Sequence, residues 1–363
     1  MPDSTAEQGP MRIGLEDLRS FTADVFATLG LAAEDAGIVA DCLVGADLRG
    51  VYSHGVIRIP IYAERLRRGL FNATPNIEVT RLSASAARVD GDNGMGAVVG
   101  TRAIDEAMAL AQSAGIGVVS AVHSNHYGIA SYYTQRAVER GYIAISCSNA
   151  PPTTAPFGGG APFIGTNPFA IAAPAGAHPA LVLDMSSSVV ARGKIIAAAQ
   201  ANEPIPEGWA LDKHGRPTTD AAAALEGAVL TFGGPKGSGI AVFVEILAAV
   251  LAGANITHQL PDFYRNLTDV PNLGQFFLAI DVARFMPAES FRAKMDELVE
   301  SLKACPPAAG HDEVLMPGEI EARLEAERVR DGIPLSAEIL ASLREAGAQA
   351  GVPFPEEALQ PVG

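Results

Sequence analysis

Residues 83–122 read SASAARVDGDNGMGAVVGTRAIDEAMALAQSAGIGVVSAV and alternate strand-like and helical segments. Residues 83–90 have the composition of a β-strand, and GDNGMG marks a turn. Residues 101–114 repeat apolar side chains at helical spacing until Gly115, after which residues 116–122 again resemble a strand. This alternation predicts a layered α/β unit.

The alternation continues toward the C-terminus. A helix is expected over 130–140, followed by strands over 142–148, 169–173 and 181–184. Residues 151–174 are crowded with proline and glycine, which fix unusual backbone angles. We expect an ordered functional loop there rather than a flexible linker.

Helical periodicity marks both ends of the chain. Apolar residues recur at three- and four-residue spacing within 15–71, and the same spacing recurs after residue 287. Because the ends of a domain often lie close together, these segments predict one helical domain with the α/β domain inserted. The expected boundaries are 1–80 and 287–363 for the helical domain and 81–286 for the inserted one.

Composition excludes several classes of protein. The chain has 363 residues, 48% hydrophobic and 18% charged, as expected of a globular protein. Its net charge of −15 repels phosphate backbones and anionic membranes, so neither nucleic acid nor membrane is an expected partner. The longest apolar run, 240–254, is too short to span a bilayer and contains Glu245. We expect it to form a buried helix.

The cysteines indicate the compartment. Cys42, Cys147 and Cys305 lie far apart, form no zinc-binding pair and are odd in number. The first residues, MPDSTAEQGPMRIG, contain no basic segment followed by an apolar one, so no secretory signal is expected. A reduced protein in the cytoplasm is the resulting expectation.

The motif SHGVIR is the first candidate site. Arg58 offers a planar fork suited to a carboxylate, and His54 can exchange a proton near neutral pH while Ser53 orients it. Gly55 allows close approach of a ligand. This set suits a 2-oxo or 2-hydroxy acid. The alternative interpretation is a helix start with a solvated arginine and a hydrogen-bonded surface histidine.

The motif HSNHYG, residues 123–128, directly follows the strand 116–122, where α/β domains usually bind ligands. A metal pair of His123 and His126 is conceivable, but no acidic residue completes a coordination sphere. There are two other interpretations. The motif could be a turn that merely caps the strand, or it could contact cofactor or substrate.

Three further segments contain candidate ligand contacts. In the loop 153–174, glycines expose backbone N–H groups beside Thr166 and Asn167. FGGPKGSG, residues 232–239, is not a P-loop, but it places Lys236 at a helix N-terminus where an anion could bind. Each could instead be structural.

Asp184 ends an apolar run, and Arg192 and Lys194 follow it, so the three could contact a ribose and a phosphate. An ordinary surface ion pair is the alternative. GDNGMGAVVG gives GxGxxxG, not the GxGxxG of a dinucleotide fingerprint, so no Rossmann site is predicted.

Together and in this order, the motifs resemble the malate/L-lactate dehydrogenase family of the type-two, non-Rossmann kind. That family includes ureidoglycolate, sulfolactate and diketogulonate enzymes and cyclic imine reductases. The matching pieces span Asp47 to about Glu319: SHGVIR, SNHYG, APFGG with GTNPFA, LDMSSSVVARGK, IPEGWALDKHGRPTTD, GGPKGSG and DEVLMPGE.

The resemblance implies a fold and a set of roles. The fold would be a two-layer, mixed-sheet α/β domain that binds NAD or NADP without a Rossmann fold, inserted into a discontinuous helical domain of a homodimer. His54 would transfer the proton with Ser53 as its orienting partner, and Arg58 would hold the substrate carboxylate. Thr166 and Arg192 would also contact substrate. In some relatives the histidine matching His126 transfers the proton, so both remain candidates.

The resemblance also implies the cofactor contacts, with no metal ion, and NADH as the slightly preferred form. The residues are His123, Ser124, Asn125, His126, Tyr127, Asp184, Met185, Ser186, Lys194, Pro235, Lys236, Gly310, His311, Asp312, Glu313 and Met316.

One position separates the subclasses. The imine reductases have an acid after ARG, whereas this chain has Lys194 there. The sequence therefore predicts hydride transfer between NAD(P)H and a small acid resembling malate, lactate, sulfolactate or ureidoglycolate. The alternatives are an NADPH-dependent reductase of piperideine- or pyrroline-2-carboxylate, a metal-dependent hydrolase or lyase, and a non-catalytic sensor.

Overall fold

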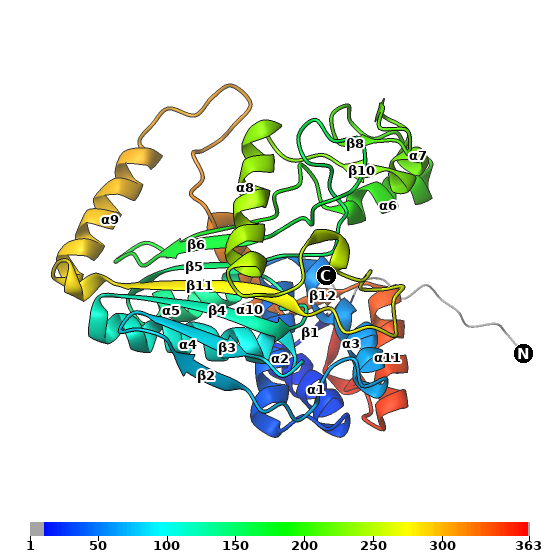
Figure 1. Ribbon diagram of the computed structural model, residues 1–363, viewed down its shortest axis with the longest axis horizontal. Helices are drawn as coiled ribbons and strands as arrows, with labels where there is room; N and C mark the ends of the chain where they lie inside the picture. The colour runs from blue at the N-terminus through cyan, green and yellow to red at the C-terminus, as the bar shows by residue number, and fades with distance from the viewer. Residues whose placement is uncertain (1–10, 362–363) are drawn as a thin grey trace, which may run out of the picture.

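A mixed seven-stranded sheet forms the centre of the molecule in the computed structural model, which describes residues 11–361 (Figure 1). The strand order is β2-β3-β4-β11-β5-β6-β7. Only β3 and β4 pair in parallel; the other pairings in this sheet are antiparallel. The strands are β2 (Glu78–Arg81), β3 (Ala86–Asp90), β4 (Ile116–Ser124), β5 (Tyr142–Ser148), β6 (Phe169–Ala173), β7 (Leu181–Met185) and β11 (Leu273–Asp281).

The central strand β11 was not predicted from the sequence. Its residue Phe277 lies opposite Val119 of β4 and Ser146 of β5, so both strand edges are hydrogen-bonded. Most of its side chains are buried on both faces of the sheet. A strand covered on both faces lacks the alternation of apolar and polar residues that identifies a half-exposed strand.

Helices cover both faces of this sheet. α4 (Gly96–Ala114) and α5 (Ser131–Val138) share a core with one face, and α8 (Pro235–Glu245) packs on the other and continues into a π-helical turn, Ile246–Val250. The expectation of two layers is therefore incomplete. α4 also begins before the predicted residue 101, since Gly96 and Gly100 are part of the helix. A Cβ at either position would collide with neighbouring backbone or with Tyr133, so both positions require glycine.

Segments from both ends of the chain pack together. β1 (Met11–Ile13) pairs with β12 (Ile333–Leu335) and with β13 (Leu359–Pro361) in a second sheet. One core joins this sheet to the first and last helices. These helices are α1 (Leu15–Thr28), α2 (Ala33–Leu48), α3 (Ile59–Arg67) and α11 (Ala337–Ala350). Residues 1–10, most of the segment in which no secretory signal is expected, lie outside the described part of the chain.

The remaining C-terminal helices lie elsewhere. α9 (Ala288–Lys303) is on the opposite side of the molecule from α11 (Figure 1). There Asp296 accepts hydrogen bonds from the main-chain N–H groups of Gly176 and Ala177, in the turn between β6 and β7. α10 (Glu319–Asp331) leads from this edge back to α2. The division at residues 80 and 287 stays a prediction.

A smaller lobe has its own core. It consists of α6 (Arg192–Ala201), α7 (Ala221–Glu226), β8 (Ala210–Leu211), β9 (Pro217–Thr218) and β10 (Ala228–Val229).

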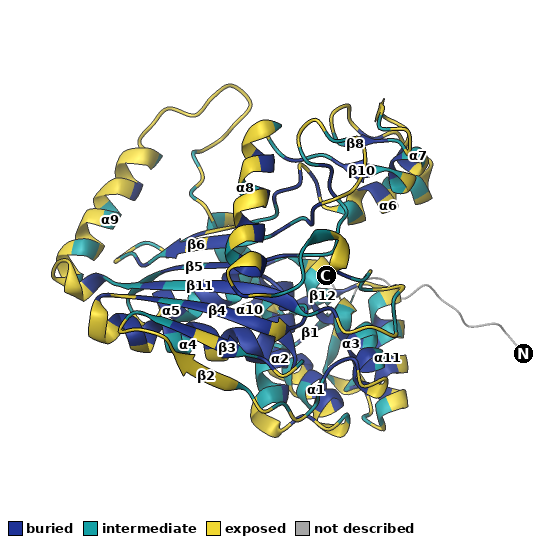
Figure 2. Cartoon of the chain, in the orientation of Figure 1, coloured by how far each residue is buried: buried dark blue, intermediate teal, exposed yellow. Residues whose placement is uncertain are grey.

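The helix predicted over 240–254 is not fully buried, which corrects the sequence analysis. Val242, Phe243 and Ile246 are exposed, Phe243 to 67%, and Val250 and Leu251 extend this apolar stripe (Figure 2). The helix has one covered face and one uncovered face, and its composition does not distinguish them. Within residues 11–361, no helix has the length and apolarity that a membrane span requires.

Candidate active site

The motif SHGVIR folds into two short 3-10 turns, Tyr52–His54 and Val56–Arg58, between α2 and α3. Ser53 Oγ lies 2.8 Å from His54 Nδ1. Arg58 donates from Nε to the Ser53 carbonyl oxygen at 2.6 Å. Its two terminal nitrogens have no hydrogen-bond partner among residues 11–361 and face no carboxylate there, so the fork of the guanidinium is available to a ligand.

His126, from the loop after β4, joins this group. Its ring stacks on His54 with centroids 5.4 Å apart and an interplanar angle of 19°. Its Nδ1 lies 2.6 Å from the Tyr62 hydroxyl and accepts the N–H of Gly128 at 3.4 Å. Because a backbone N–H can only donate, the proton of the neutral ring belongs on Nε2. His126 therefore presents an N–H group to the space beside it.

Burial controls the charge of the site. It lowers the pKa of His54 to about 3, with a smaller contribution from the nearby Arg58 charge. Burial also lowers the pKa of His126 well below its usual range, helped by Arg58 and His54. Both imidazoles are therefore neutral at physiological pH. The guanidinium of Arg58 remains positive, although burial lowers its pKa too.

Two aromatic residues from the segment before β11 cover the site. The Phe263 ring lies 5.2 Å from that of His126, and the Tyr264 ring lies 5.2 Å from the guanidinium carbon of Arg58. Arg65 donates hydrogen bonds of 3.0 Å to the carbonyl oxygens of Phe263 and Asn266. The aromatic cover is thus anchored to α3.

Sequence reasoning missed Tyr62, Phe263 and Tyr264. Tyr62 follows Arg58 by one helical turn, so its position on the same face of α3 was a usable signal. The two aromatic residues lie far along the chain, and no motif marks them.

His123 and His126, the pair considered above for a metal ion, turn to different partners. His123 Nδ1 points to Asp90, 2.9 Å away, while His126 turns to Tyr62. Within the described residues no three His, Cys, Asp or Glu side chains gather as a metal site would require.

Three neighbours of His126 have side chains that support the fold. Ser124 Oγ accepts a hydrogen bond from Gln275 at 2.8 Å. Asn125 donates to the Gly94 carbonyl oxygen at 2.9 Å, and Tyr127 stacks on Tyr133 with centroids 4.9 Å apart. All three are buried, which leaves mainly their backbone for a ligand.

The predicted contacts beyond β5 are not hydrogen-bonded to Ser53, His54, Arg58 or His126. The Thr166 carbonyl oxygen accepts the N–H of Ser187 at 2.7 Å, and Asp184 accepts that of Ser131 at 2.8 Å. Met185 is half-buried, Ser186 pairs with Ser188, and Arg192 donates to the Leu225 carbonyl oxygen at 3.1 Å. Lys194 is exposed.

Pro235 and Lys236 begin α8 and border a hollow of about 540 Å³ between this helix and the sheet. Ile145, Cys147 and Phe169 contribute to its apolar wall. Lys236 is exposed and forms no ion pair within residues 11–361.

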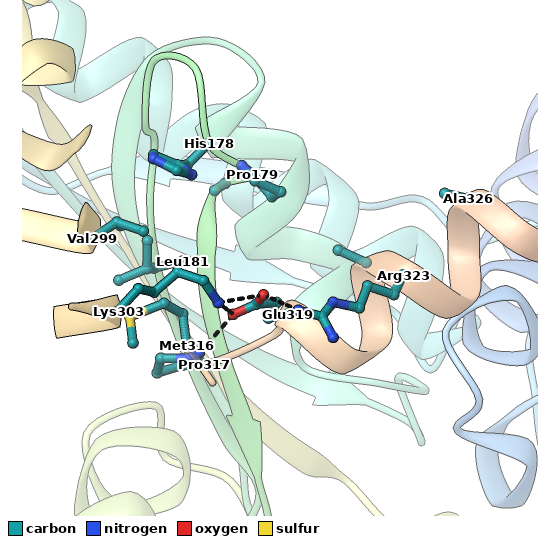
Figure 3. A pocket seen from close by; sticks show the side chains of 12 residues that line it. His178, Pro179, Leu181, Val299, Lys303, Met316, Pro317, Glu319, Arg323 and Ala326 are labelled. Atoms are coloured by element: carbon teal, nitrogen blue, oxygen red, sulfur yellow. Dashed lines mark hydrogen bonds and ion pairs between the residues drawn. The ribbon is translucent and has the colours of Figure 1, made fainter. Parts of the chain in front are cut away.

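The last predicted segment lies between α9 and α10. Gly310, His311, Asp312 and Glu313 are exposed, and Met316 lines a pocket of about 280 Å³ beside β7 (Figure 3). Glu313 is bound to Arg323 at 2.5 Å, and Glu319 lies between Arg323 and Lys303. The charges around this pocket are mutually neutralised.

Comparison with known proteins agrees with the motif resemblance. A family model described as malate/L-lactate dehydrogenase matches residues 13–344. The L-sulfolactate dehydrogenase of Methanocaldococcus jannaschii is 42% identical over 91% of this chain and 94% of its own. The malate dehydrogenase of Pyrococcus horikoshii is 38% identical over 95% of this chain and 97% of its own. The ureidoglycolate dehydrogenase (NAD(+)) of Escherichia coli K12 is 35% identical over 91% of this chain and 94% of its own.

Solved structures have the same fold. The sulfolactate dehydrogenase from M. jannaschii superposes with a TM-score of 0.89 at 41% identity, covering 95% of this chain and 98% of that one. The delta1-piperideine-2-carboxylate reductase from Pseudomonas syringae pvar. tomato gives 0.84 at 29% identity, covering 92% and 99%. The family resemblance predicted from the motifs is confirmed.

Proposed function

The chain belongs to the malate/L-lactate dehydrogenase family, and we propose that it transfers hydride between NAD(P)H and a small 2-oxo or 2-hydroxy acid. The observation that best supports this activity is the free guanidinium fork of Arg58 beside two stacked, neutral imidazoles. One group recognises a carboxylate, and the others exchange a proton on the neighbouring oxygen.

Arg58 binds the substrate carboxylate. Its terminal nitrogens can make two parallel hydrogen bonds to the two carboxylate oxygens, a geometry that fixes orientation as well as position. The Nε bond to the Ser53 carbonyl oxygen and the Tyr264 ring hold the guanidinium in place beforehand. This preorganisation reduces the entropy lost on binding.

The histidines move the proton. His126 presents Nε2–H and can donate to the oxygen of an oxo acid as that oxygen gains negative charge. His54 shares a hydrogen bond with Ser53 that permits either tautomer, so it can accept the proton of a hydroxy acid in the reverse direction. Both remain candidates for the transfer, and burial keeps both neutral until an acid binds beside them.

A bound nicotinamide supplies or accepts the hydride. The hollow beside α8 fits such a cofactor because its wall is apolar and Lys236 offers a positive charge at the rim. The predicted contacts at 184–186 and 310–316, with Lys194, would hold the rest of the molecule. We propose that it binds to this mixed sheet without a Rossmann fold and that NADH is slightly preferred.

A homodimer is the proposed assembly. The apolar stripe on α8 and the turn that follows it, from Val242 to Leu251, is exposed in the single chain, and large exposed apolar patches mark interaction surfaces. Cys42, Cys147 and Cys305 are free thiols, in keeping with a reducing compartment such as the cytoplasm.

A cyclic imino acid is the second candidate substrate, favoured by the similarity to the piperideine-2-carboxylate reductase. Lys194 and the higher identity to the sulfolactate and malate enzymes favour the hydroxy acid. The test is a panel of 2-oxo acids and cyclic imines, each assayed with NADH and NADPH by nicotinamide absorbance. Turnover of an oxo acid is expected. Turnover of imines alone would establish the alternative, and no turnover of either would contradict the proposed function.

A further inference from the structure

We propose that Asp47 and Arg328 are positioning residues that hold the loop bearing His54 and Arg58, without touching substrate themselves. This inference rests on the proposed function for its catalytic consequences. Its structural part can be tested separately.

Within the loop 53–58, one backbone N–H group is bonded to a side chain outside the loop. His54 N–H donates to the Val51 carbonyl oxygen at 2.9 Å, and Arg58 N–H donates to that of Gly55 at 3.0 Å. The N–H of Val56, at the junction of the two turns, instead donates to Asp47 Oδ2 at 2.7 Å. The junction between the proton-transfer residue and the carboxylate-binding residue therefore depends on one side chain.

Asp47 is an unusual residue for such a place. It lies in the last turn of α2, is only 2% exposed and forms no ion pair within residues 11–361. Burying a carboxylate costs free energy unless hydrogen bonds compensate. Burial accordingly raises the pKa of Asp47 to about 7, and the Val56 N–H and the Arg328 charge oppose this rise.

Gly55 lies directly against the same carboxylate. Its φ of −88° is open to any residue, so backbone conformation does not require glycine here. A Cβ on Gly55 would instead lie only 2.1–2.3 Å from the carboxylate atoms of Asp47, which is a severe clash. The glycine of the SHG motif thus makes room for Asp47.

Arg328 holds the other side of the loop. From α10 it donates to the main-chain oxygen of Asp47 and to the hydroxyl of Tyr52, and its guanidinium carbon lies 4.8 Å from the centre of the Tyr52 ring. It is 5% exposed. A second link, from Arg49 to Glu325 at 2.6 Å, ties the same two helices together.

These contacts place the loop between the ends of α2 and α10. Ser53 and His54 precede the pinned junction at Val56, and Arg58 follows it. Small displacements of catalytic groups, of about 1 Å, can lower rates about 100-fold. Loss of the Asp47 hydrogen bond should therefore change both kcat and KM for the acid.

The test compares Asp47→Asn, Asp47→Ala, Gly55→Ala and the double variant Asp47→Ala/Gly55→Ala. Asparagine retains an oxygen for the Val56 N–H, so Asp47→Asn should keep most of the activity, whereas Asp47→Ala should lose about 10- to 100-fold in kcat/KM. Gly55→Ala should lose at least as much. In the double variant the added methyl group fills the space left by the carboxylate, so its loss should not exceed that of Asp47→Ala.

Two outcomes would overturn the proposal: equal losses in Asp47→Asn and Asp47→Ala, or losses that multiply in the double variant, as for independent sites. Arg328→Gln should lower kcat/KM, with Arg330→Gln on the exposed side of α10 as the matched control. The dissociation constant for NADH should stay unchanged in all variants. An unchanged value also shows that the variants are folded.

A crystal structure of Asp47→Ala gives a readout without catalysis. Residues 53–58 should be displaced while α2 and the sheet superpose on the parent protein. An undisplaced loop would overturn the positioning role. Failure of the parent protein to turn over any acid would instead contradict the proposed function and leave this structural result standing.

Discussion

The substrate side and the cofactor side of the proposed site are constructed differently. On the substrate side, Arg58, Tyr62 and His126 are half-buried or buried and are linked by hydrogen bonds to one another or to the backbone. On the cofactor side, Lys194, Lys236 and the segment 310–313 are exposed, and the charges near Glu313 pair among themselves.

This difference shows which half is organised by the single chain. The substrate half has its geometry before any ligand binds, because buried groups have few alternative positions. On the cofactor side, Lys194, Lys236 and residues 310–313 offer separate, solvated contacts, each worth little alone. Substitutions of Arg58 or Tyr62 should therefore change the kinetics with the acid far more than the affinity for the dinucleotide. Substitutions of the exposed residues on the cofactor side should have small effects, mainly on the affinity for the dinucleotide.

The two histidines should give the largest effects. Replacing the proton-transfer residue by alanine should lower kcat by about 10² to 10⁴, the usual contribution of a positioned acid or base. If His126 is the donor, His126→Ala should lose more than His54→Ala in the reduction of an oxo acid. Steady-state kinetics in both directions measure this, with His214→Ala in an exposed turn as control. Near-parental kcat in both site variants would contradict the proton-transfer role.

Arg58→Lys should have the next largest effect. Lysine keeps the charge but loses the fork, and hydrogen bonds to a charged group contribute about 1.5–3 kcal/mol. We expect KM for the oxo acid to rise about 10- to 100-fold while NADH binding is unchanged. Titration of NADH fluorescence beside the kinetic assay separates the two, and Arg88→Lys on the exposed side of β3 is the control. An equal loss of NADH affinity would erase the contrast between the two sides.

Part of this site could be predicted from the sequence. Ser53, His54 and Arg58 lie within the short motif SHGVIR and bear recognisable chemistry, and His126 lies in a motif that follows a predicted strand. Asp47, Arg328 and Phe263 could not be predicted, because their roles depend on contacts between segments far apart in the chain. A single sequence without known contacts has no signal for such pairs.

The same limit applies to the fold. Residues 83–122 predicted β3, α4 and β4, since local periodicity determines an amphipathic helix and a strand. The first turn of α4 was missed because its glycines suggested a loop, although they allow close packing against Tyr133 and His126. The run 240–254 has the apolarity of a buried helix, but apolarity does not reveal whether the chain itself or a second copy covers it.

Tyr62→Phe tests how the substrate side is organised. The variant keeps the ring packed against Phe71 and Phe263 and removes only the hydroxyl bonded to His126 Nδ1. A hydrogen bond of this kind contributes about 0.5–1.5 kcal/mol, so kcat should fall roughly 2- to 10-fold. Tyr142→Phe, near the far end of β5, is the control. An unchanged kcat together with an unchanged pH profile would show that the hydroxyl does not orient the imidazole.

Lys236→Ala should give the smallest effect and tests the cofactor side. The ammonium group is exposed at the start of α8, where a charge contributes about 0.3–1 kcal/mol to binding an anion. The dissociation constant for NADH should rise about 2- to 5-fold, with kcat at saturating cofactor unchanged, and Lys294→Ala on α9 should leave both unchanged. Because solvated ions are screened by salt, the difference between Lys236→Ala and the parent should shrink as ionic strength rises. A loss of 100-fold or more would mean that Lys236 is desolvated in the complex, and the cofactor side would then be as tightly organised as the substrate side once the dinucleotide is bound.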